Sequence, residues 1–156
     1  MANNYLLFSE ELELRNKKEF EWVKKEIERL DAERDENDNP VLDFQYALEE
    51  SKTRPKKYGL WMYTEEAGEP VKVGEFVQAY LKKFHPDDIF TLTWAATCSR
   101  PRLGQFGGGG MVVTAKQLYF TEAGCWVSNK VEEILRLKKA QEKRKEKDNG
   151  RSRKSK

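Results

Sequence analysis

The chain has 156 residues, of which 38% are hydrophobic and 12% aromatic, which is enough for one ordinary globular core. No run approaches the roughly 18 consecutive apolar residues of a membrane span. The start, Met1-Ala2-Asn3-Asn4, lacks the basic and apolar regions of a signal peptide. We therefore expect one domain, located in the cytoplasm, with no membrane among its partners.

The net charge of +2 conceals an uneven distribution along the chain. Residues 136–156 hold 11 Lys/Arg and 3 Asp/Glu, which leaves 18 Lys/Arg and 24 Asp/Glu for residues 1–135. The charges predict one acidic α+β domain, residues 1–137, followed by a basic, largely disordered tail, residues 138–156. Such a tail either binds nucleic acid or an acidic partner surface, or merely keeps the protein in solution.

The first half of the chain has the pattern of a strand, a helix and a second strand. Residues 6–8 form a short apolar run that suits a strand. Apolar residues recur every three or four positions over residues 19–30, which predicts an amphipathic helix. Phe44, Tyr46 and Leu48 then alternate as one buried face of a strand does.

An acidic stretch joins this helix to the second strand, because residues 31–50 hold eight carboxylates and Arg34 alone as a cation. A solvated loop explains that composition. The alternative is an acidic surface that mimics nucleic acid and occupies a basic groove on another protein, which would suit an inhibitor.

The second half repeats the order of the first, with an apolar run at residues 61–63, a helical pattern over residues 73–84 and an apolar run at residues 92–95. Residues 6–11 overlay on residues 61–66, which predicts an internal duplication. Residues 51–57 are interpreted as the connection between the halves. Two such units in tandem predict a ferredoxin-like βαββαβ fold, with the first and third strands adjacent and parallel.

Two further elements follow the duplicated halves. Residues 111–115 and 117–120 predict an extra strand or hairpin, and Val127, Val131, Ile134 and Leu135 give a last helix an apolar side as far as about residue 137.

The main candidate site is the segment after the last strand of the second half. It combines Arg100 and Arg102, beside Pro101, with a run of glycines: Gly107, Gly108, Gly109 and Gly110. Arginine offers a planar fork for phosphate or carboxylate, and a glycine-rich loop can aim several amides at one anion. We expect partner or anion binding here, although solvated arginines on a hairpin connection would give the same pattern.

This segment matches no phosphate-binding motif. No Gly-Lys-Ser/Thr follows the glycines, and Gly104 stands where a phosphatase loop starting at Cys98 would need its arginine. Catalysis by Cys98 or His85 has no supporting nucleophile and base spacing. Cys98 and Cys125 are expected to be reduced and partly buried thiols. No catalytic residue and no cofactor are assigned.

Two weaker candidates lie elsewhere. If the first and third strands are parallel, their ends bring together four carboxylates that could bind a divalent cation: Glu10, Glu11, Glu65 and Glu66. Alternatively these glutamates follow turns capped by Ser9 and Thr64, so no metal is assigned. Trp22 falls to one side of the buried stripe of its helix, which makes it a candidate interface residue.

The motif Trp-Ala-x-Thr-Cys-Ser-x-Pro-Arg-x3-Phe-Gly-Gly-Gly, residues 94–109, together with residues 60–63 and 76–81, resembles an uncharacterised family of small proteins of bacteria, their phages and mobile elements. The resemblance spans roughly residues 5–126 and implies no activity or catalytic residue. It implies a context, namely an accessory protein that interferes with or attaches to a host nucleoprotein machine.

The sequence therefore predicts a non-catalytic binding protein that engages a protein or nucleoprotein partner. Nucleic acid is a further candidate partner through the basic tail, and a second copy of the chain is a candidate partner for an uncovered sheet face. The alternative hypothesis is an enzyme or sensor that binds a phosphorylated small molecule or nucleotide at Arg100, Arg102 and the glycines.

Overall fold

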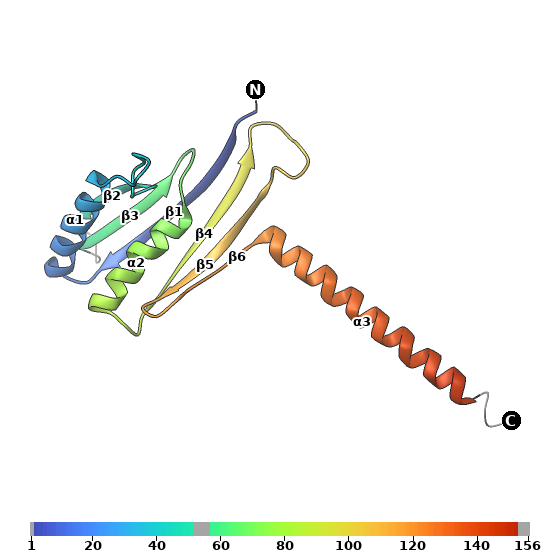
Figure 1. Cartoon of the computed structure of the whole chain (residues 1–156). Coiled ribbons are helices and arrows are strands. Elements are labelled where there is room, and N and C mark those ends of the chain that lie inside the picture. The colour runs from blue at the N-terminus through green and yellow to red at the C-terminus, as the bar shows by residue number, and fades with distance from the viewer. Residues whose placement is uncertain (1, 52–56, 153–156) are drawn as a thin grey trace. The chain divides into compact units, whose positions relative to one another are not determined.

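The structure is a computed structural model that describes residues 2–51 and 57–152 (Figure 1). Most of the predicted connection at residues 51–57 and the last four residues of the predicted tail lie outside the described residues. The chain forms two compact units, Met1–Thr121 and Glu122–Lys156.

The first unit holds two helices and an open antiparallel sheet whose six strands lie in the order β2-β3-β1-β4-β5-β6 (Figure 1). The elements are β1 (Asn4–Leu14), α1 (Lys17–Ala32), β2 (Gln45–Glu50), β3 (Tyr58–Thr64), α2 (Pro70–Phe84), β4 (Ile89–Cys98), β5 (Gly107–Thr114) and β6 (Leu118–Glu122). The α+β class is therefore confirmed. The predicted parallel pairing of the first and third strands is wrong, because β1 and β3 pair antiparallel.

Both helices pack on one face of the sheet, and the core lies between them and that face. Val23 and Ile27 of α1 and Val73 and Val77 of α2 have no exposed surface. They meet the buried residues of the strands, among which Leu60 and Met62 of β3 are also fully buried. We call the opposite side of the sheet, which no helix of this unit covers, the open face.

The strand β1 is longer than its sequence suggested and continues through the glutamates. Leu12 and Leu14 are buried while Glu11 and Glu13 are exposed, which is the alternation of a half-buried strand. Ser9 lies in the middle of β1, whereas Thr64 ends β3 and its hydroxyl donates to the carbonyl oxygen of Ala67 at 2.6 Å. The two overlaid positions, Ser9 and Thr64, thus have different local structures.

The glycine run forms the start of β5. Its residues lie opposite Ala96 to Thr93 of β4 in antiparallel register. A Cβ atom on Gly109 would lie 2.4 Å from the Trp94 ring and 2.4 Å from the carbonyl oxygen of Thr121, so only glycine fits here. Gly108 has a φ of 149°, and a Cβ there would lie 2.4 Å from the carbonyl oxygen of Trp94. Gly109 thus lets the Trp94 side chain lie against β5, and Gly108 lets the backbones of β4 and β5 approach closely.

The second unit is dominated by one helix, α3 (Ala123–Ser152), of 30 residues. It begins four residues before the predicted start at Val127. Cys125 is exposed on it, so the expectation of a partly buried thiol is wrong for this residue, while Cys98 is half-buried. No helix in the described part of the chain is both long and apolar enough to span a membrane.

Candidate functional site

The loop between β4 and β5, residues 99–106, is the candidate contact surface, and we call it the contact loop. Every one of its residues is exposed. It is fixed at its start, because the backbone N–H of Ser99 donates to the carbonyl oxygen of Asn3 at 2.9 Å and the Ser99 hydroxyl accepts from the Asn3 backbone N–H at 2.9 Å. The loop therefore leaves the sheet from a defined position and presents its side chains to solvent.

The contact loop carries both predicted arginines and two large apolar side chains. Leu103 is fully exposed and Phe106 is 58% exposed. Among the described residues, no side-chain hydrogen bond or ion pair involves Arg100 or Arg102. Within that part of the structure the two cations thus have no such partner, and Leu103 and Phe106 expose most of their surface beside them.

The glycines do not form the anion cradle that the sequence suggested. In a strand, successive N–H groups point to opposite sides, so they cannot converge on one anion as the amides of a phosphate-binding loop do. Gly107, Gly108, Gly109 and Gly110 lie in such a strand, between β4 and β6. The glycines serve the packing of β5 on Trp94, and the two arginines are left as the binding candidates.

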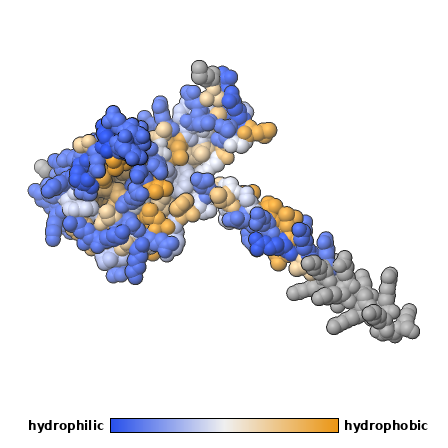
Figure 2. All heavy atoms as spheres, in the orientation of Figure 1, coloured by the Kyte–Doolittle hydropathy of each residue, from blue (hydrophilic) through white to orange (hydrophobic). Residues whose placement is uncertain are grey.

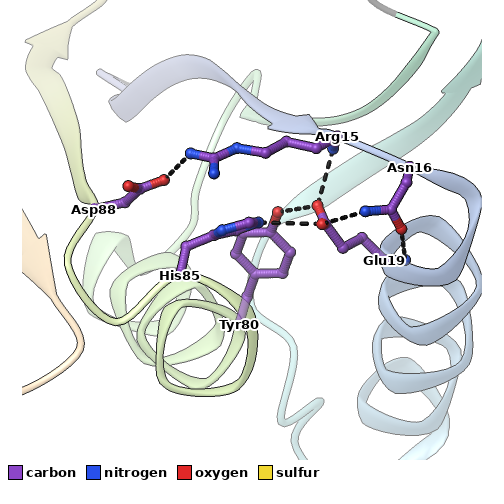
Figure 3. Close-up of polar contacts among 6 residues, drawn as sticks. All are labelled: Arg15, Asn16, Glu19, Tyr80, His85 and Asp88. Carbon is purple, nitrogen blue, oxygen red and sulfur yellow. Dashed lines mark hydrogen bonds and ion pairs between the residues drawn. The ribbon is translucent and has the colours of Figure 1, made fainter.

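A second polar cluster, which the sequence analysis missed, is centred on Glu19 (Figure 3). The side chain of Glu19 is buried at the start of α1. Its Oε2 atom accepts hydrogen bonds from the Tyr80 hydroxyl at 2.6 Å and from the Arg15 backbone N–H at 2.9 Å. Its Oε1 atom accepts from Asn16 Nδ2 at 2.7 Å and lies 3.1 Å from Nε2 of His85.

The residues around Glu19 come from both helices and from the segments beside them. Asn16 is the N-cap of α1 and accepts a hydrogen bond from the Glu19 backbone N–H at 3.1 Å. His85 is the C-cap of α2 and directly follows the predicted helical residues 73–84. Arg15 and Asp88 form an ion pair at the outer side of the cluster. The cluster therefore joins the first turn of α1 to the last turn of α2.

The surroundings shift the pKa of two groups in this cluster. Burial alone would raise the pKa of Glu19, but hydrogen bonds from Tyr80, Arg15 and His85 outweigh it and hold the pKa below the ordinary value of a glutamate. Burial, and then the hydrogen bond to the Glu19 carboxylate, raise the pKa of Tyr80 far above its ordinary value. Glu19 is thus an anion and Tyr80 a neutral donor at neutral pH.

This chemistry is structural. Both carboxylate oxygens of Glu19 are occupied by groups of the chain itself, so the carboxylate has no free position at which to act as a base. The Nε2 atom of His85 is buried and has no hydrogen-bond partner other than its approach to Glu19, which is an ion pair only when the ring carries both protons. The pattern Asn16-x-x-Glu19, a capping box, was the signal that could have revealed this cluster.

The remaining candidates do not form a site. The side chains of Glu10 and Glu11 point to opposite faces of β1, and Glu65 and Glu66 follow the end of β3 opposite residues near the start of β1. Within the described residues, no group of three or more His, Cys, Asp or Glu side chains could hold a metal ion. The antiparallel pairing of β1 and β3 is the reason that the four carboxylates stay apart.

Trp22 is half-buried and packs against the core. Its ring lies 6.4 Å from the ring of Phe76 and 5.5 Å from that of Phe84, measured between centroids, and Lys83 Nζ lies 5.3 Å from its centroid. The position of Trp22 beside the buried stripe is therefore explained by the contact of α1 with α2.

The fold and its surfaces define an α+β protein with an exposed contact loop and a buried polar cluster that ties its helices together. Models of known protein families, curated proteins and solved structures yield no match to this chain.

Proposed function

We propose that this chain is a non-catalytic binding protein that engages a macromolecular partner, foremost a protein or nucleoprotein, through the contact loop. The observation that carries the proposal is the exposure of Arg100, Arg102, Leu103 and Phe106 together on one loop that is fixed to the sheet at Ser99. Arginine and aromatic side chains are enriched at the energetic centres of protein interfaces.

A protein surface fits this loop better than a nucleic-acid backbone does. Residues 1–135 carry 24 Asp/Glu against 18 Lys/Arg, so the domain as a whole repels phosphates. A protein partner with an acidic patch beside an apolar pocket would satisfy both arginines and cover Leu103 and Phe106. The basic residues 136–156 then add a salt-dependent attraction to an acidic partner or to nucleic acid bound to it.

Two further interpretations, one of the fold and one of the biological context, accompany this proposal. The neighbouring order β2-β3-β1-β4, with α1 and α2 on one face, supports a ferredoxin-like arrangement of these elements. An internal duplication would account for that arrangement, although Ser9 and Thr64 now differ in structure. The resemblance to proteins of phages and mobile elements supports a host macromolecule as the partner, and capture by the contact loop would be the means of interference.

The test is affinity capture from a bacterial host lysate with the full chain as bait, read by quantitative mass spectrometry. The variants are Arg100→Ala with Arg102→Ala, and Leu103→Ala with Phe106→Ala. The matched control is Lys24→Ala with Lys25→Ala, which removes the same charge from exposed positions on α1. We expect one defined partner to be lost from both loop variants and retained by the control.

Equal recovery of every captured protein by the loop variants and by the native chain would refute the contact loop as the site. Fluorescence anisotropy with a single-stranded and a double-stranded oligonucleotide, over a salt series, tests whether the loop binds nucleic acid rather than protein. Binding that disappears only when Arg100 and Arg102 are replaced would make the loop a nucleic-acid site and would overturn the protein partner.

A further inference from the structure

The first part of α3, residues 123–137, has an apolar half and a polar half. Figure 2 shows hydrophobic atoms, in orange, beside hydrophilic atoms on this part of the helix. At about 100° of rotation per residue, six large apolar side chains fall within about one half of the helix circumference. They are 45–59% exposed: Trp126, Val127, Val131, Ile134, Leu135 and Leu137.

The polar half of the circumference is formed by the residues between these positions. They are Cys125, Ser128, Asn129, Glu132, Glu133 and Arg136. Within residues 123–137, Lys130 is the one charged residue that falls on the apolar half. Its Nζ atom lies 2.6 Å from Glu133 Oε2, which draws the ammonium group toward the polar half. The division of the helix surface is therefore nearly complete.

A helix with two such halves suits a flat boundary between an apolar medium and water. A coiled coil with a second copy would use a narrower seam, continued over at least about three heptads. On α3 that seam would run through Val127, Val131 and Ile134, but its next positions are Lys138 and Gln141. Pairing of two α3 helices would therefore be short and would leave much of the apolar half uncovered.

A basic segment follows directly on the apolar part of the helix. Residues 136–156 hold 11 Lys/Arg and 3 Asp/Glu. A short apolar surface binds lipid only weakly, and stable attachment needs a second attraction, such as that of basic residues to anionic headgroups. Nucleic acid would neutralise the basic residues but would leave the apolar half in water. An anionic lipid surface complements both parts of the segment.

We propose that α3 lies along a membrane surface rich in anionic lipids. Its apolar half enters the boundary between headgroups and acyl chains, and the basic residues that follow attract the headgroup phosphates. The expectation of no membrane partner came from the absence of a spanning run, and a helix that lies on the surface needs none. The proposal does not rest on the function proposed for the contact loop.

The test is co-sedimentation of the full chain with vesicles of phosphatidylcholine alone and of an equal mixture of phosphatidylcholine and phosphatidylglycerol. We expect binding to the mixed vesicles that weakens as the salt concentration rises, and little binding to phosphatidylcholine alone. A native chain that stays in solution with both kinds of vesicle would overturn the proposal.

One pair of variants tests the apolar half. Val131→Gln with Ile134→Gln should weaken binding to the mixed vesicles by about tenfold or more, because it removes two apolar groups without adding charge. Ser128→Gln with Asn129→Gln is the matched control on the polar half and should change binding by less than about twofold. If the two double variants bound equally, the basic segment alone would attract lipid, and the docking of the helix would be refuted.

A second pair of variants tests the charge. Lys138→Gln with Lys139→Gln should weaken binding about tenfold, whereas Lys24→Gln with Lys25→Gln removes the same charge from exposed positions on α1 and should have little effect. Urea denaturation of the apolar variant without vesicles excludes another occupant. A clear fall in its free energy of unfolding would mean that the chain itself covers the apolar half, and the proposal would fail.

Discussion

In the Glu19 cluster both carboxylate oxygens accept hydrogen bonds from other groups of the same chain, whereas no side-chain hydrogen bond or ion pair of the contact-loop arginines is found among the described residues. Both regions consist of residue types that functional sites use, a carboxylate with a histidine and a tyrosine in one and two arginines in the other, but only the second was a candidate from the sequence. Residue types alone therefore do not distinguish a structural polar cluster from a candidate binding surface. Burial and hydrogen bonds within the chain mark the cluster as structural, whereas exposure without such bonds is the basis on which we propose the loop as a surface for another molecule.

The largest effect is expected from the cluster. Glu19→Gln replaces an acceptor that four donors approach with a side chain that brings its own donor, so the free energy of unfolding should fall by about 2–3 kcal/mol. Urea denaturation followed by circular dichroism measures this loss. Glu21→Gln, at an exposed position of the same helix, is the matched control and should change stability by no more than about 0.5 kcal/mol. If both variants had the same free energy of unfolding, Glu19 would not have the structural role described.

The next largest effect on stability is expected from the glycine run, which the sequence had suggested as part of the binding site. Gly109→Ala forces a Cβ atom against the Trp94 ring and the Thr121 carbonyl, and we expect a loss of about 2 kcal/mol by the same measurement. In Gly110→Ala the new Cβ atom would lie no closer than 3.7 Å to any atom, so this control variant should lose little stability. If Gly109→Ala left stability unchanged but abolished partner capture, the glycine run would belong to the binding surface after all.

The pH dependence of the free energy of unfolding gives a further test of the structural role of Glu19. Because the folded-state pKa of Glu19 is lowered from its ordinary value of 4.5, the stabilisation by Glu19 is complete above that ordinary value and is lost as the pH falls through the folded-state pKa. The native chain should therefore lose more stability between pH 5 and pH 3 than Glu19→Gln does. Parallel curves for the two proteins in urea titrations at each pH would show that Glu19 does not titrate as described.

The smallest effect on stability is expected from the contact loop. Arg100→Ala with Arg102→Ala should change the free energy of unfolding by less than about 0.5 kcal/mol, because neither side chain has an intramolecular partner among the described residues. The same variant is expected to lose its partner in affinity capture. A loss of several kcal/mol in the free energy of unfolding would mean that the arginines stabilise the fold. They would then not differ from Glu19 in role.

Periodicity sufficed for the elements whose faces are clearly divided. The spacing of Phe20, Val23 and Ile27 predicted α1, and residues 73–84 predicted α2, because a helix that packs on a sheet must keep one apolar side. The alternation of Glu11 and Glu13 with Leu12 and Leu14 carried the same information for the end of β1. The sequence analysis instead placed Glu10 and Glu11 beside a turn capped by Ser9, which ended the predicted strand too early.

The parts that failed depend on contacts between distant residues. Nothing local distinguishes a glycine run in a loop from one in a strand, since Gly109 is required by the ring of Trp94 and by the Thr121 carbonyl. The direction of β3 against β1 is likewise a property of the whole sheet. The exposure of the contact loop was consistent with its sequence, but only the structure adds Leu103 and Phe106 to its arginines as one surface.

The first strand of the chain lies in the middle of the sheet, between β3 and β4, and this has a consequence for synthesis on the ribosome. Leu7 pairs with Ala95, a residue that is made some 88 positions later. At about 5–20 residues per second, β1 must wait for roughly 5–20 seconds with one edge unpaired. Glu10, Glu11 and Glu13, which follow the waiting residues Asn4–Leu7 on the same strand, would disfavour the joining of another chain during that time.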